Sequence, residues 1–350
     1  MLRYLTQHLS SGSPLKWSDN MYKTIGFFSG VGGIEMGFSQ AGFDITWANE
    51  YDSKAQQTYL LNHNSYLNKN DISCLESDDV PNSDVVLAGF PCQAFSVAGY
   101  RKGFEDDRGN MFFEVIRLIK ERLPRVLFFE NVKNLVSHDK GNTFKVILET
   151  LHSHGYFVKH KVLNSSEYGN IPQNRERIYI VAFFNKSDYE KFSFPDPLKL
   201  VKSIHDVIDF TDKKEDIYYY TKNKYKFYPE LEKTITSQNS IYQWRRKYVR
   251  ENKSGVCPTL TANMGTGGHN VPLILTDLGI RKLTPKECFM FQGYPDDFKL
   301  PNIANSHLYK QAGNSVVIPV VKRIADNIMF ALKETDKLSK HDENQLVFNI

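Results

Sequence analysis

The stretch TIGFFSGVGG, residues 24–33, indicates the architecture of this 350-residue chain. Its first half is an apolar run typical of a buried strand, and its glycines open a segment in which apolar residues recur at helical spacing. A glycine-rich turn between a strand and a helix lets the backbone approach a ligand at the N-terminus of the helix. Because the glycines lack the G-x-G-x-x-G spacing of dinucleotide-binding proteins, the pattern taken alone also suits a structural turn.

Buried runs and amphipathic segments alternate onward from this stretch to about residue 184. We expect strands at residues 45–48, 85–88 and 126–129, and helices at residues 111–122 and 143–154. Two β-rich runs, at residues 156–163 and 177–183, extend the sheet. This alternation predicts an α/β fold with a doubly wound, mainly parallel sheet.

The character of the sequence changes after residue 195, where short pieces rich in tyrosine, lysine and turn formers begin. We expect a catalytic and cofactor-binding domain at residues 21–195, a small irregular recognition domain at 196–275, and a return to the first domain at 276–335. That return includes a closing helix at residues 319–332. Residues 1–20 are expected to be an N-terminal extension, and residues 336–350 a polar C-terminal tail.

The composition excludes several classes of protein. No run of about 18 apolar residues appears, and residues 1–20 lack the apolar core of a secretory signal, so we expect a cytoplasmic protein without a membrane partner. The four cysteines are far apart and form no C-x-x-C pair, so neither a disulfide framework nor a metal site is expected.

Basic and aromatic residues gather between residues 221 and 256. This segment carries nine lysines or arginines against three acids, a net charge of +6, whereas the whole chain has a net charge of +4. Six aromatic residues are interleaved with these charges. The combination predicts a surface that faces a polyanion, although a solvated face with long cationic side chains over apolar surface is the alternative.

Two chemically reactive side chains follow buried runs. Cys92 lies in the sequence GFPCQ, residues 89–93, directly after the run at 85–88, and Glu130 follows the run at 126–129. The carboxyl ends of the strands in an open α/β sheet form the crevice that binds ligands. A lone cysteine after a strand is usually inert, but a carboxylate at the neighbouring strand end favours a catalytic role for Cys92.

Eight segments of the chain, in this order and spacing, resemble the motif set of the bacterial DNA cytosine-5 methyltransferases of type II restriction-modification systems. The resemblance extends over roughly residues 22–332 and implies the fold of S-adenosylmethionine-dependent methyltransferases with a DNA-recognition domain. The segments are residues 28–33, 49–50, 71–72, 91–93, 130–132, 173–177, 281–298 and 313–317.

The resemblance also implies a mechanism. The Cys92 thiolate adds to C6 of a cytosine that has been flipped out of the duplex, which makes C5 nucleophilic enough to take a methyl group. Glu130 is expected to balance the charge that develops at N3 of the ring, and Arg177 to hold O2, with Arg175 assisting. Residues 94–110, which include Arg101 and Lys102, are expected to close over the base and contact DNA.

The implied cofactor is S-adenosylmethionine, and the expected binding residues are Phe28, Gly30, Gly32, Glu50, Tyr51, Asp71, Ile72 and Asn314. This chain departs from the common family pattern at two positions. Gly26 stands where an acid often precedes the glycines, and Tyr51 stands where many members have tryptophan. Because tyrosine can still stack on adenine, we expect cofactor binding to survive.

Sequence recognition is expected in the basic segment and in Thr259, which with Leu260 resembles a short Thr-Leu element of the family. One arginine should read a guanine, and Lys247 or Arg250 should hold phosphate. The expected DNA-contacting residues of this region are Arg245, Arg246, Lys247, Arg250 and Thr259.

Other readings of the same residues remain open at this point. A tRNA cytosine-5 methyltransferase shares the motif set but has a shorter insert, so the long basic insert favours duplex DNA. A catalytically inactive DNA-binding regulator is disfavoured by intact Cys92, Glu130 and Arg177, and a dehydrogenase by the glycine spacing. The expected partners are a short duplex site and a cognate restriction endonuclease, with the enzyme acting as a monomer.

Overall fold

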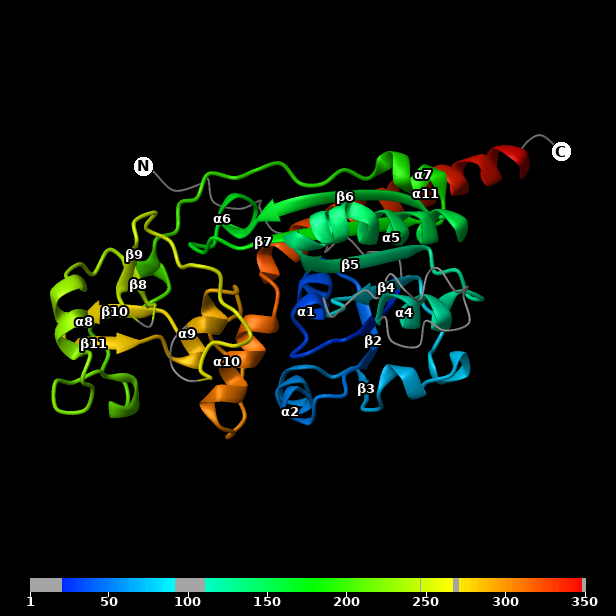
Figure 1. Cartoon of the computed structure of the whole chain (residues 1–350). Coiled ribbons are helices and arrows are strands. Elements are labelled where there is room, and N and C mark those ends of the chain that lie inside the picture. Colours follow the sequence, from blue (N-terminus) through cyan, green and yellow to red (C-terminus); the bar gives the residue numbers. More distant parts are fainter. Residues whose placement is uncertain (1–20, 92–110, 246, 267–270, 348–350) are drawn as a thin grey trace, which may run out of the picture.

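The computed structural model describes residues 21–91, 111–245, 247–266 and 271–347. The described residues form a large α/β body and a small lobe built on a second sheet (Figure 1). Two helices, α9 (Pro285–Met290) and α10 (Asn305–Asn314), lie between the two sheets. The expected extension at 1–20 and the expected closing loop at 94–110 lie outside the described residues.

The large sheet has seven strands in the order β3-β2-β1-β4-β5-β7-β6. Neighbours pair in parallel from β3 to β5, whereas β7 runs antiparallel to both β5 and β6. This confirms the predicted doubly wound, mainly parallel sheet. The strands are β1 (Lys23–Phe27), β2 (Asp44–Asn49), β3 (Tyr66–Asn68), β4 (Val85–Ala88), β5 (Val126–Val132), β6 (Phe157–Asn164) and β7 (Glu176–Phe183).

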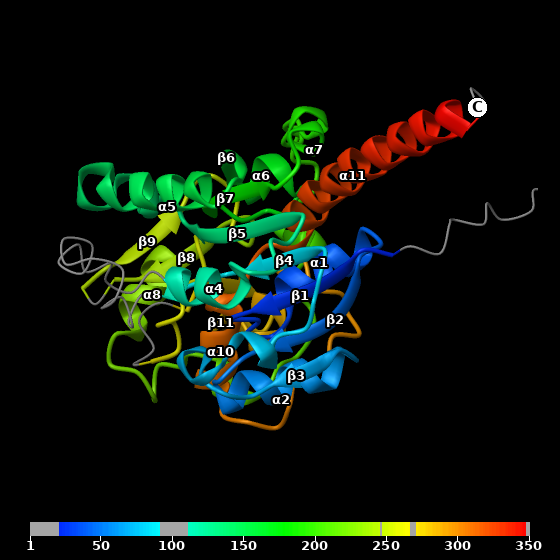
Figure 2. The ribbon, with the colours of Figure 1, turned by 90° about the vertical axis from the view of Figure 1, so that its right-hand side faces the viewer.

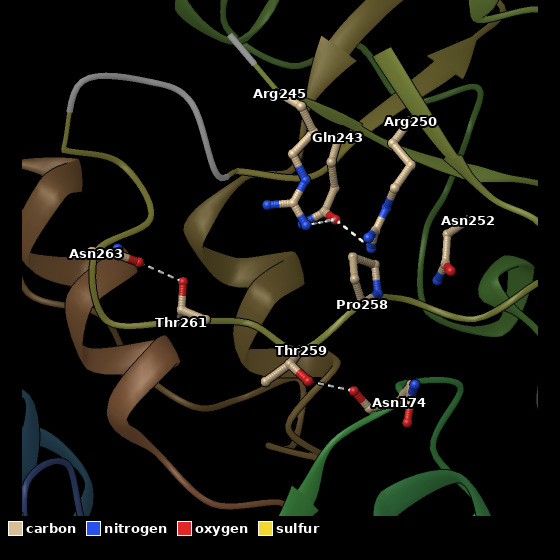
Figure 3. A pocket seen from close by; sticks show the side chains of 9 residues that line it. All are labelled: Asn174, Gln243, Arg245, Arg250, Asn252, Pro258, Thr259, Thr261 and Asn263. Atoms are coloured by element: carbon tan, nitrogen blue, oxygen red, sulfur yellow. Dashed lines mark hydrogen bonds between the residues drawn. The ribbon is translucent and has the colours of Figure 1, made fainter. Parts of the chain in front are cut away.

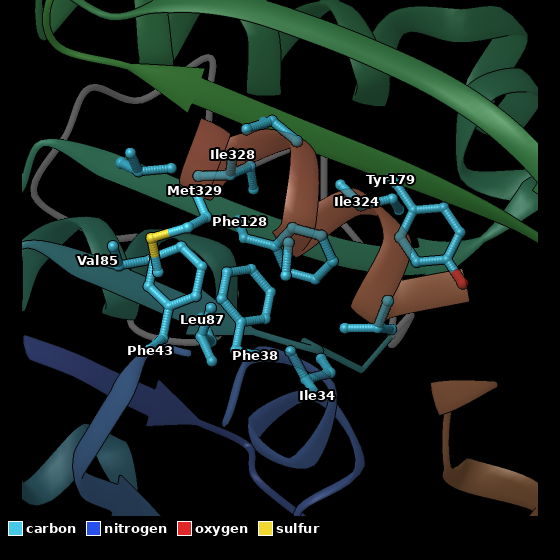
Figure 4. Packing of buried hydrophobic residues seen from close by; sticks show 14 of the residues in the cluster. Ile34, Phe38, Phe43, Val85, Leu87, Phe128, Tyr179, Ile324, Ile328 and Met329 are labelled. Atoms are coloured by element: carbon cyan, nitrogen blue, oxygen red, sulfur yellow. The ribbon is translucent and has the colours of Figure 1, made fainter. Parts of the chain in front are cut away.

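Helices cover both faces of this sheet, because the buried strands are apolar on both sides. Along β4, Val85 and Leu87 pack in one core cluster with Phe38, whereas Val86 and Ala88 pack in another with Phe112. Figure 4 shows the first cluster between the sheet, α1 and α11. The second cluster faces α4 and α5 (Figure 2). The helices of the body are α1 (Gly33–Gln40), α2 (Ser53–Asn62), α4 (Met111–Ile119), α5 (Asn142–Ser153), α6 (Ser165–Tyr168), α7 (Lys186–Lys191) and α11 (Ile318–Val347).

The pairing of β5 with β7 moves one predicted boundary. We expected a strand to end at residue 129, but β5 continues to Val132 because it pairs with β7 from Val126 opposite Phe183 to Val132 opposite Arg177. Glu130 therefore lies inside a strand rather than directly after one. Its side chain gains a fixed direction from the pleat of the sheet.

The small lobe is an antiparallel sheet in the order β11-β10-β8-β9, with α8 (Tyr228–Thr234) beside it. Its strands are β8 (Ile241–Trp244), β9 (Val249–Asn252), β10 (Leu273–Thr276) and β11 (Gly279–Lys282). The expected domain boundary at residue 275 falls within β10. The tight hairpin between β10 and β11, in which Thr276 Oγ1 donates to the carbonyl of Gly279, keeps the chain in this sheet through Lys282.

Residues 336–347 of the expected C-terminal tail are helical, because α11 continues as one helix to Val347. Two contacts hold its extension to the body. The Asp336 carboxylate accepts hydrogen bonds from the Tyr22 hydroxyl at 2.5 Å and from Arg125 Nη1 at 2.7 Å. Residues after 332 are also rich in good helix formers such as Lys, Glu and Leu, and polarity alone does not end a helix.

We predict that Asp336→Ala lowers the free energy of unfolding by about 1 to 2 kcal/mol, because a partly exposed carboxylate that accepts two hydrogen bonds is lost. Urea denaturation measures this change. Lys337→Ala is the matched control: its exposed pair with Glu334 should contribute little to stability, because solvent screens the two charges. Equal effects of the two substitutions would contradict the anchoring role of Asp336.

Candidate active site and nucleic-acid face

The expected site residues gather at the carboxyl edge of the large sheet, on both sides of β1 and β4. The strand order reverses between these two neighbours, since the chain continues outward to β2 and β3 on one side and to β5 on the other. Such a reversal leaves a crevice beyond the strand ends, because the connections leave in opposite directions. The glycine loop, residues 28–33, follows β1, and the segment that leads to Cys92 follows β4.

The backbone of the glycine loop adopts left-handed conformations at three positions. The φ angles are 54° at Phe28, 56° at Gly30 and 84° at Gly32. Gly32 is the position where only glycine fits, because a Cβ there would lie 2.0 Å from His63 Nε2. Gly32 also starts α1 without a side-chain cap, so this helix N-terminus presents backbone rather than a polar side chain to the crevice.

Glu50, directly after β2, is tied to the glycine loop. One carboxylate oxygen accepts the Gly30 N–H at 2.8 Å, and the other accepts the Asp52 N–H at 2.7 Å. Burial raises the pKa of Glu50, and these two backbone donors oppose that rise. A carboxylate has further lone pairs on both oxygens, so Glu50 can accept hydroxyl groups of a ligand while it holds the loop.

The other expected cofactor residues surround the same edge. Tyr51 leaves 68% of its surface exposed, and Asn314, the last residue of α10, is also exposed. Asp71 caps the short helix η1 (Ile72–Cys74) through Oδ1, which accepts from Ser73. Ile72 is buried behind it. The exposed ring of Tyr51 and the exposed carboxylate of Asp71 can receive an aromatic amine.

Glu35 is a residue of this region that the sequence did not bring to attention. It lies in the first turn of α1 with 1% of its surface exposed. Its Oε1 occupies the space beside Gly26, where a Cβ would approach it to 2.2 Å. Position 26 is where an acid often stands in the family pattern. The glycine at this position in β1 therefore leaves room for the carboxyl group of Glu35, which α1 supplies.

On the other side of the reversal, Glu130 and Arg177 form a buried ion pair. The Arg177 Nε lies 3.1 Å from Glu130 Oε1, and both side chains are almost fully buried. Their positions on β5 and β7 are offset by two residues across the antiparallel pair, so they share one face of the sheet. Burial raises the pKa of Glu130, while Arg177 and Arg175 oppose this rise.

Asn131 joins this pair to the segment that carries the expected nucleophile. Its Nδ2 donates to the carbonyl of Phe90 at 2.9 Å. Gly89 is close as well, since a Cβ there would lie 3.8 Å from Glu130 Oε2. Cys92 itself lies outside the described residues, but the chain that leads to it is fixed beside Glu130 as far as Pro91.

We expected Arg175 to assist at the substrate base, but its hydrogen bonds go to the backbone of the protein instead. Its buried guanidinium donates to the carbonyl of Leu260 and, at the end of α10, to the carbonyls of Gly313 and Ser315, so it joins two separate segments. Burial, with Arg177 nearby, lowers the pKa of Arg175 to about 9. These contacts fit a bracing role between the large sheet and the segment that enters the small lobe.

Four of the expected DNA-contacting residues lie on the described part of the small lobe and its junction. Arg245, Arg250 and Thr259 line a polar hollow of about 410 Å³ (Figure 3), and Lys247 is exposed on the same hairpin. Arg101, Lys102 and Arg246 lie outside the described residues. The complete lining of the hollow is Asn174, Gln243, Arg245, Arg250, Asn252, Pro258, Thr259, Thr261 and Asn263.

Within the described ranges, no group of three or more potential ligands (His, Cys, Asp or Glu) could hold a metal ion. No helix in the same part of the chain is long and apolar enough to cross a membrane.

Comparison with known proteins matches nearly the whole described body. The family model for C-5 cytosine-specific DNA methylase matches residues 22–329. The chain is 61% identical to the Type II methyltransferase M.Bsp6I of Bacillus sp. (strain RFL6), over 88% of this chain and 98% of that relative. It is 39% identical to the Type II methyltransferase M.HhaI of Haemophilus parahaemolyticus, over 87% of this chain and 93% of that relative. A solved structure of a Spodoptera frugiperda DNMT2 variant shares the fold, with a TM-score of 0.68 and 19% identity over 88% of this chain and 99% of that chain.

We predict that Glu35 makes the stability of the protein depend on pH. Burial raises the pKa of Glu35 to about 7 from its ordinary value of 4.5, so between these values the folded state keeps a proton that the unfolded state releases. Stability should therefore fall as the pH rises through this window. Urea denaturation at a series of pH values should show a smaller fall for Glu35→Gln than for the wild type.

Glu121→Gln, at an exposed position, is the control and should leave the pH dependence unchanged. If Glu35→Gln gave the same slope as the wild type between pH about 4.5 and about 7, the carboxyl group of Glu35 would not be the source of the effect.

Proposed function

The chain belongs to the C-5 cytosine-specific DNA methylase family and is a DNA (cytosine-5-)-methyltransferase, and we propose that its reaction centre lies where the order of the large sheet reverses. The observation that carries this proposal is the buried Glu130–Arg177 pair beside the segment that leads to Cys92. The residues expected to bind the cofactor follow β1, β2 and β3, except for Asn314 at the end of α10.

We propose S-adenosylmethionine as the cofactor, and the residues present fit it. The glycine loop brings backbone close to the crevice, Glu50 has carboxylate lone pairs for ribose hydroxyls, and exposed Tyr51 offers a ring for adenine. Phe28, Gly30, Gly32, Asp71, Ile72 and Asn314 complete the proposed binding set. When bound, this cofactor supplies an electrophilic methyl group.

The chemistry at the base is assigned to Cys92 and Glu130. The Cys92 thiolate forms a bond to C6 of the flipped cytosine, and electrons move toward N3 of the ring. Glu130, whose pKa burial raises, shares a proton with N3 in this step and so neutralises the developing charge. C5, made nucleophilic by this addition, takes the methyl group, and N3 returns its proton to Glu130. Loss of the C5 proton to water and departure of the thiolate then restore the aromatic ring.

Arg177 positions both Glu130 and the base. Its Nε faces Glu130, and its Nη1 donates to the carbonyl of Glu176 at 2.8 Å, which fixes the plane of the guanidinium group. The remaining Nη2 can donate to O2 of cytosine. We assign Arg175 to bracing, because its two terminal nitrogens already donate to backbone carbonyls.

The biological setting follows from the relatives, which are type II methyltransferases by name. The protein is a methylase of the restriction-modification type, and the tRNA and inactive-regulator alternatives have no support among these relatives. We further propose that it acts as a cytoplasmic monomer on a short duplex site, with a cognate restriction endonuclease as its partner in the system.

Bisulfite sequencing of DNA from cells that express the protein tests this function. We predict protection of one cytosine within a short sequence, and loss of that protection for Cys92→Ser, because a hydroxyl is much less ionised than a thiol near neutral pH. Cys74→Ser, at an exposed cysteine, should retain the protection. Duplexes with 5-fluorocytosine at the protected position should trap the wild type covalently, and a failure to find a Cys92 adduct would refute the nucleophile assignment.

Glu130→Gln and Glu50→Ala should produce different defects. We predict that Glu130→Gln slows methyl transfer in a single turnover by about 100-fold or more, with cofactor affinity retained. Glu50→Ala should raise the Kd for S-adenosylmethionine in calorimetry, because it removes the carboxylate that holds the glycine loop. Identical defects in the two variants, with unchanged cofactor affinity, would show that these two acids do not have separate roles.

A further inference from the structure

The polar hollow contains an arrangement of side chains that the reaction does not explain. Gln243 lies on β8 with 6% of its surface exposed, and its Oε1 accepts hydrogen bonds from two arginines. Arg245 Nη2 donates to it at 3.1 Å and Arg250 Nη2 at 3.0 Å (Figure 3). The hairpin creates this meeting, since Gln243 pairs with Arg250 across β8 and β9, and Arg245 N–H donates to the carbonyl of Tyr248 in the turn.

Two positive charges that share one neutral oxygen repel each other. Solvation reduces this repulsion at an exposed site but gives no reason to hold both guanidinium groups in one place. None of the nine residues that line the hollow is acidic, so the lining itself does not neutralise the pair. A ligand rich in hydrogen-bond acceptors would offset the repulsion.

The shared bond has a second effect, which is to orient the arginines. An arginine side chain loses much rotamer freedom when it binds a ligand in one geometry, and a preformed bond reduces that loss. Gln243 takes up one N–H of each guanidinium group and leaves their other donors for a ligand in the hollow. The remaining walls are amides, hydroxyls and one proline, which can approach the edge of a base.

The hollow is also fixed relative to the reaction centre. Residues 257–260, which form part of its wall, are tied to residues 172–175 of the large body. The Cys257 N–H donates to the carbonyl of Pro172, the Asn174 N–H donates to the carbonyl of Cys257, and Thr259 Oγ1 donates to the carbonyl of Asn174. Arg175, two residues before Arg177, donates to the carbonyl of Leu260. A base held in the hollow therefore lies at a set distance from the target cytosine.

We propose that Gln243 locks Arg245 and Arg250 into one unit that reads two guanines of the recognition site in the major groove. The inference rests on the proposed role of the small lobe in DNA recognition. Guanine presents O6 and N7 as a pair of acceptors that matches the arginine fork. A phosphate also accepts a bidentate arginine. The amide and hydroxyl walls of the hollow, however, offer the donors and acceptors that match the edge of a base. Arg250 is thus assigned to base reading, in place of the phosphate contact considered from sequence, and Gln243 is a positioning residue.

The test uses duplexes that carry the methylated site with 7-deazaguanine at one guanine at a time, which removes the N7 acceptor and leaves base pairing intact. We expect the Kd of the full-length wild type to rise about 10-fold at each of two guanines, within the range for a good bidentate contact. Arg245→Ala should abolish the penalty at one of them and Arg250→Ala at the other. Gln243→Leu should reduce both penalties, since neither arginine keeps its orientation.

Two further variants separate orientation from folding and charge. Gln243→Glu keeps an acceptor at the same place, so it should retain both penalties although its negative charge weakens binding to every duplex. Gln238→Leu is the matched control, because Gln238 lies in the same lobe, is bonded to Asp277 and does not line the hollow. It should behave as the wild type. Thermal unfolding of every variant shows whether it is folded.

The outcomes distinguish the failure of each idea. Equal weakening of all duplexes by Arg245→Ala and Arg250→Ala, with both penalties retained, would show that these arginines hold phosphate and would overturn the guanine assignment. If the 7-deazaguanine penalties disappear in the two arginine variants but persist in Gln243→Leu, only the positioning role of Gln243 is overturned. If Gln243→Leu fails to fold, the loss of the two penalties is compared between Arg245→Ala, Arg250→Ala and the double variant. A loss in the double variant that differs from the sum of the two single losses supports the unit, and a strictly additive loss opposes it. If no variant of the lobe altered sequence preference, the proposed recognition role of the lobe itself would fail.

Discussion

The reversal of strand order between β1 and β4 is the constraint on which the site depends. The connections that follow these two parallel strands leave in opposite directions, so neither covers the carboxyl ends of the strands. A crevice remains there, and the core needs no internal cavity to form a binding site. The halves of the sheet on either side then present different side chains to the crevice. Strand ends on the β2 side present Glu50 and Asp71, whereas the β4 and β5 side presents Glu130 and the segment that leads to Cys92.

A second requirement is that the small lobe keep a fixed position relative to that crevice. Buried polar contacts at the junction hold it in that position. Gln173 is fully buried and bonds to the carbonyl of Phe291, while its Oε1 accepts the Leu260 N–H. Arg175 bonds to the carbonyls of Leu260 and Gly313. Leaving any of these buried groups unpaired would cost more than an ordinary hydrogen bond gains, so the junction has few alternative arrangements. The proposed base reading in the lobe and the proposed chemistry at the sheet edge are thereby held to one geometry.

The large sheet, the order of the site elements and the family could be predicted from sequence, because they depend on local patterns and on an ordered set of motifs. Contacts between distant side chains could not. The bond from Asn131 to Phe90 and the pairing of Gln243 with two arginines depend on which strands become neighbours. The helical run past residue 335 was missed because its polar residues have no periodic apolar face, and it is fixed by Asp336 bonding to residues more than 200 positions away. The space that Gly26 leaves for Glu35 likewise appears only in three dimensions.

Glu35 and Glu130 show how one side-chain type acquires two behaviours at this edge. Burial raises the pKa of both carboxyl groups. Glu35 faces no cation among the groups that shift its pKa, and its value near 7 reflects burial opposed only by hydrogen bonds. Glu130 is opposed by the charges of Arg177 and Arg175, so its proton affinity depends on where those guanidinium groups point. The ion pair is therefore better understood as a control on the proton affinity of Glu130 than as a source of stability, which a buried pair seldom provides.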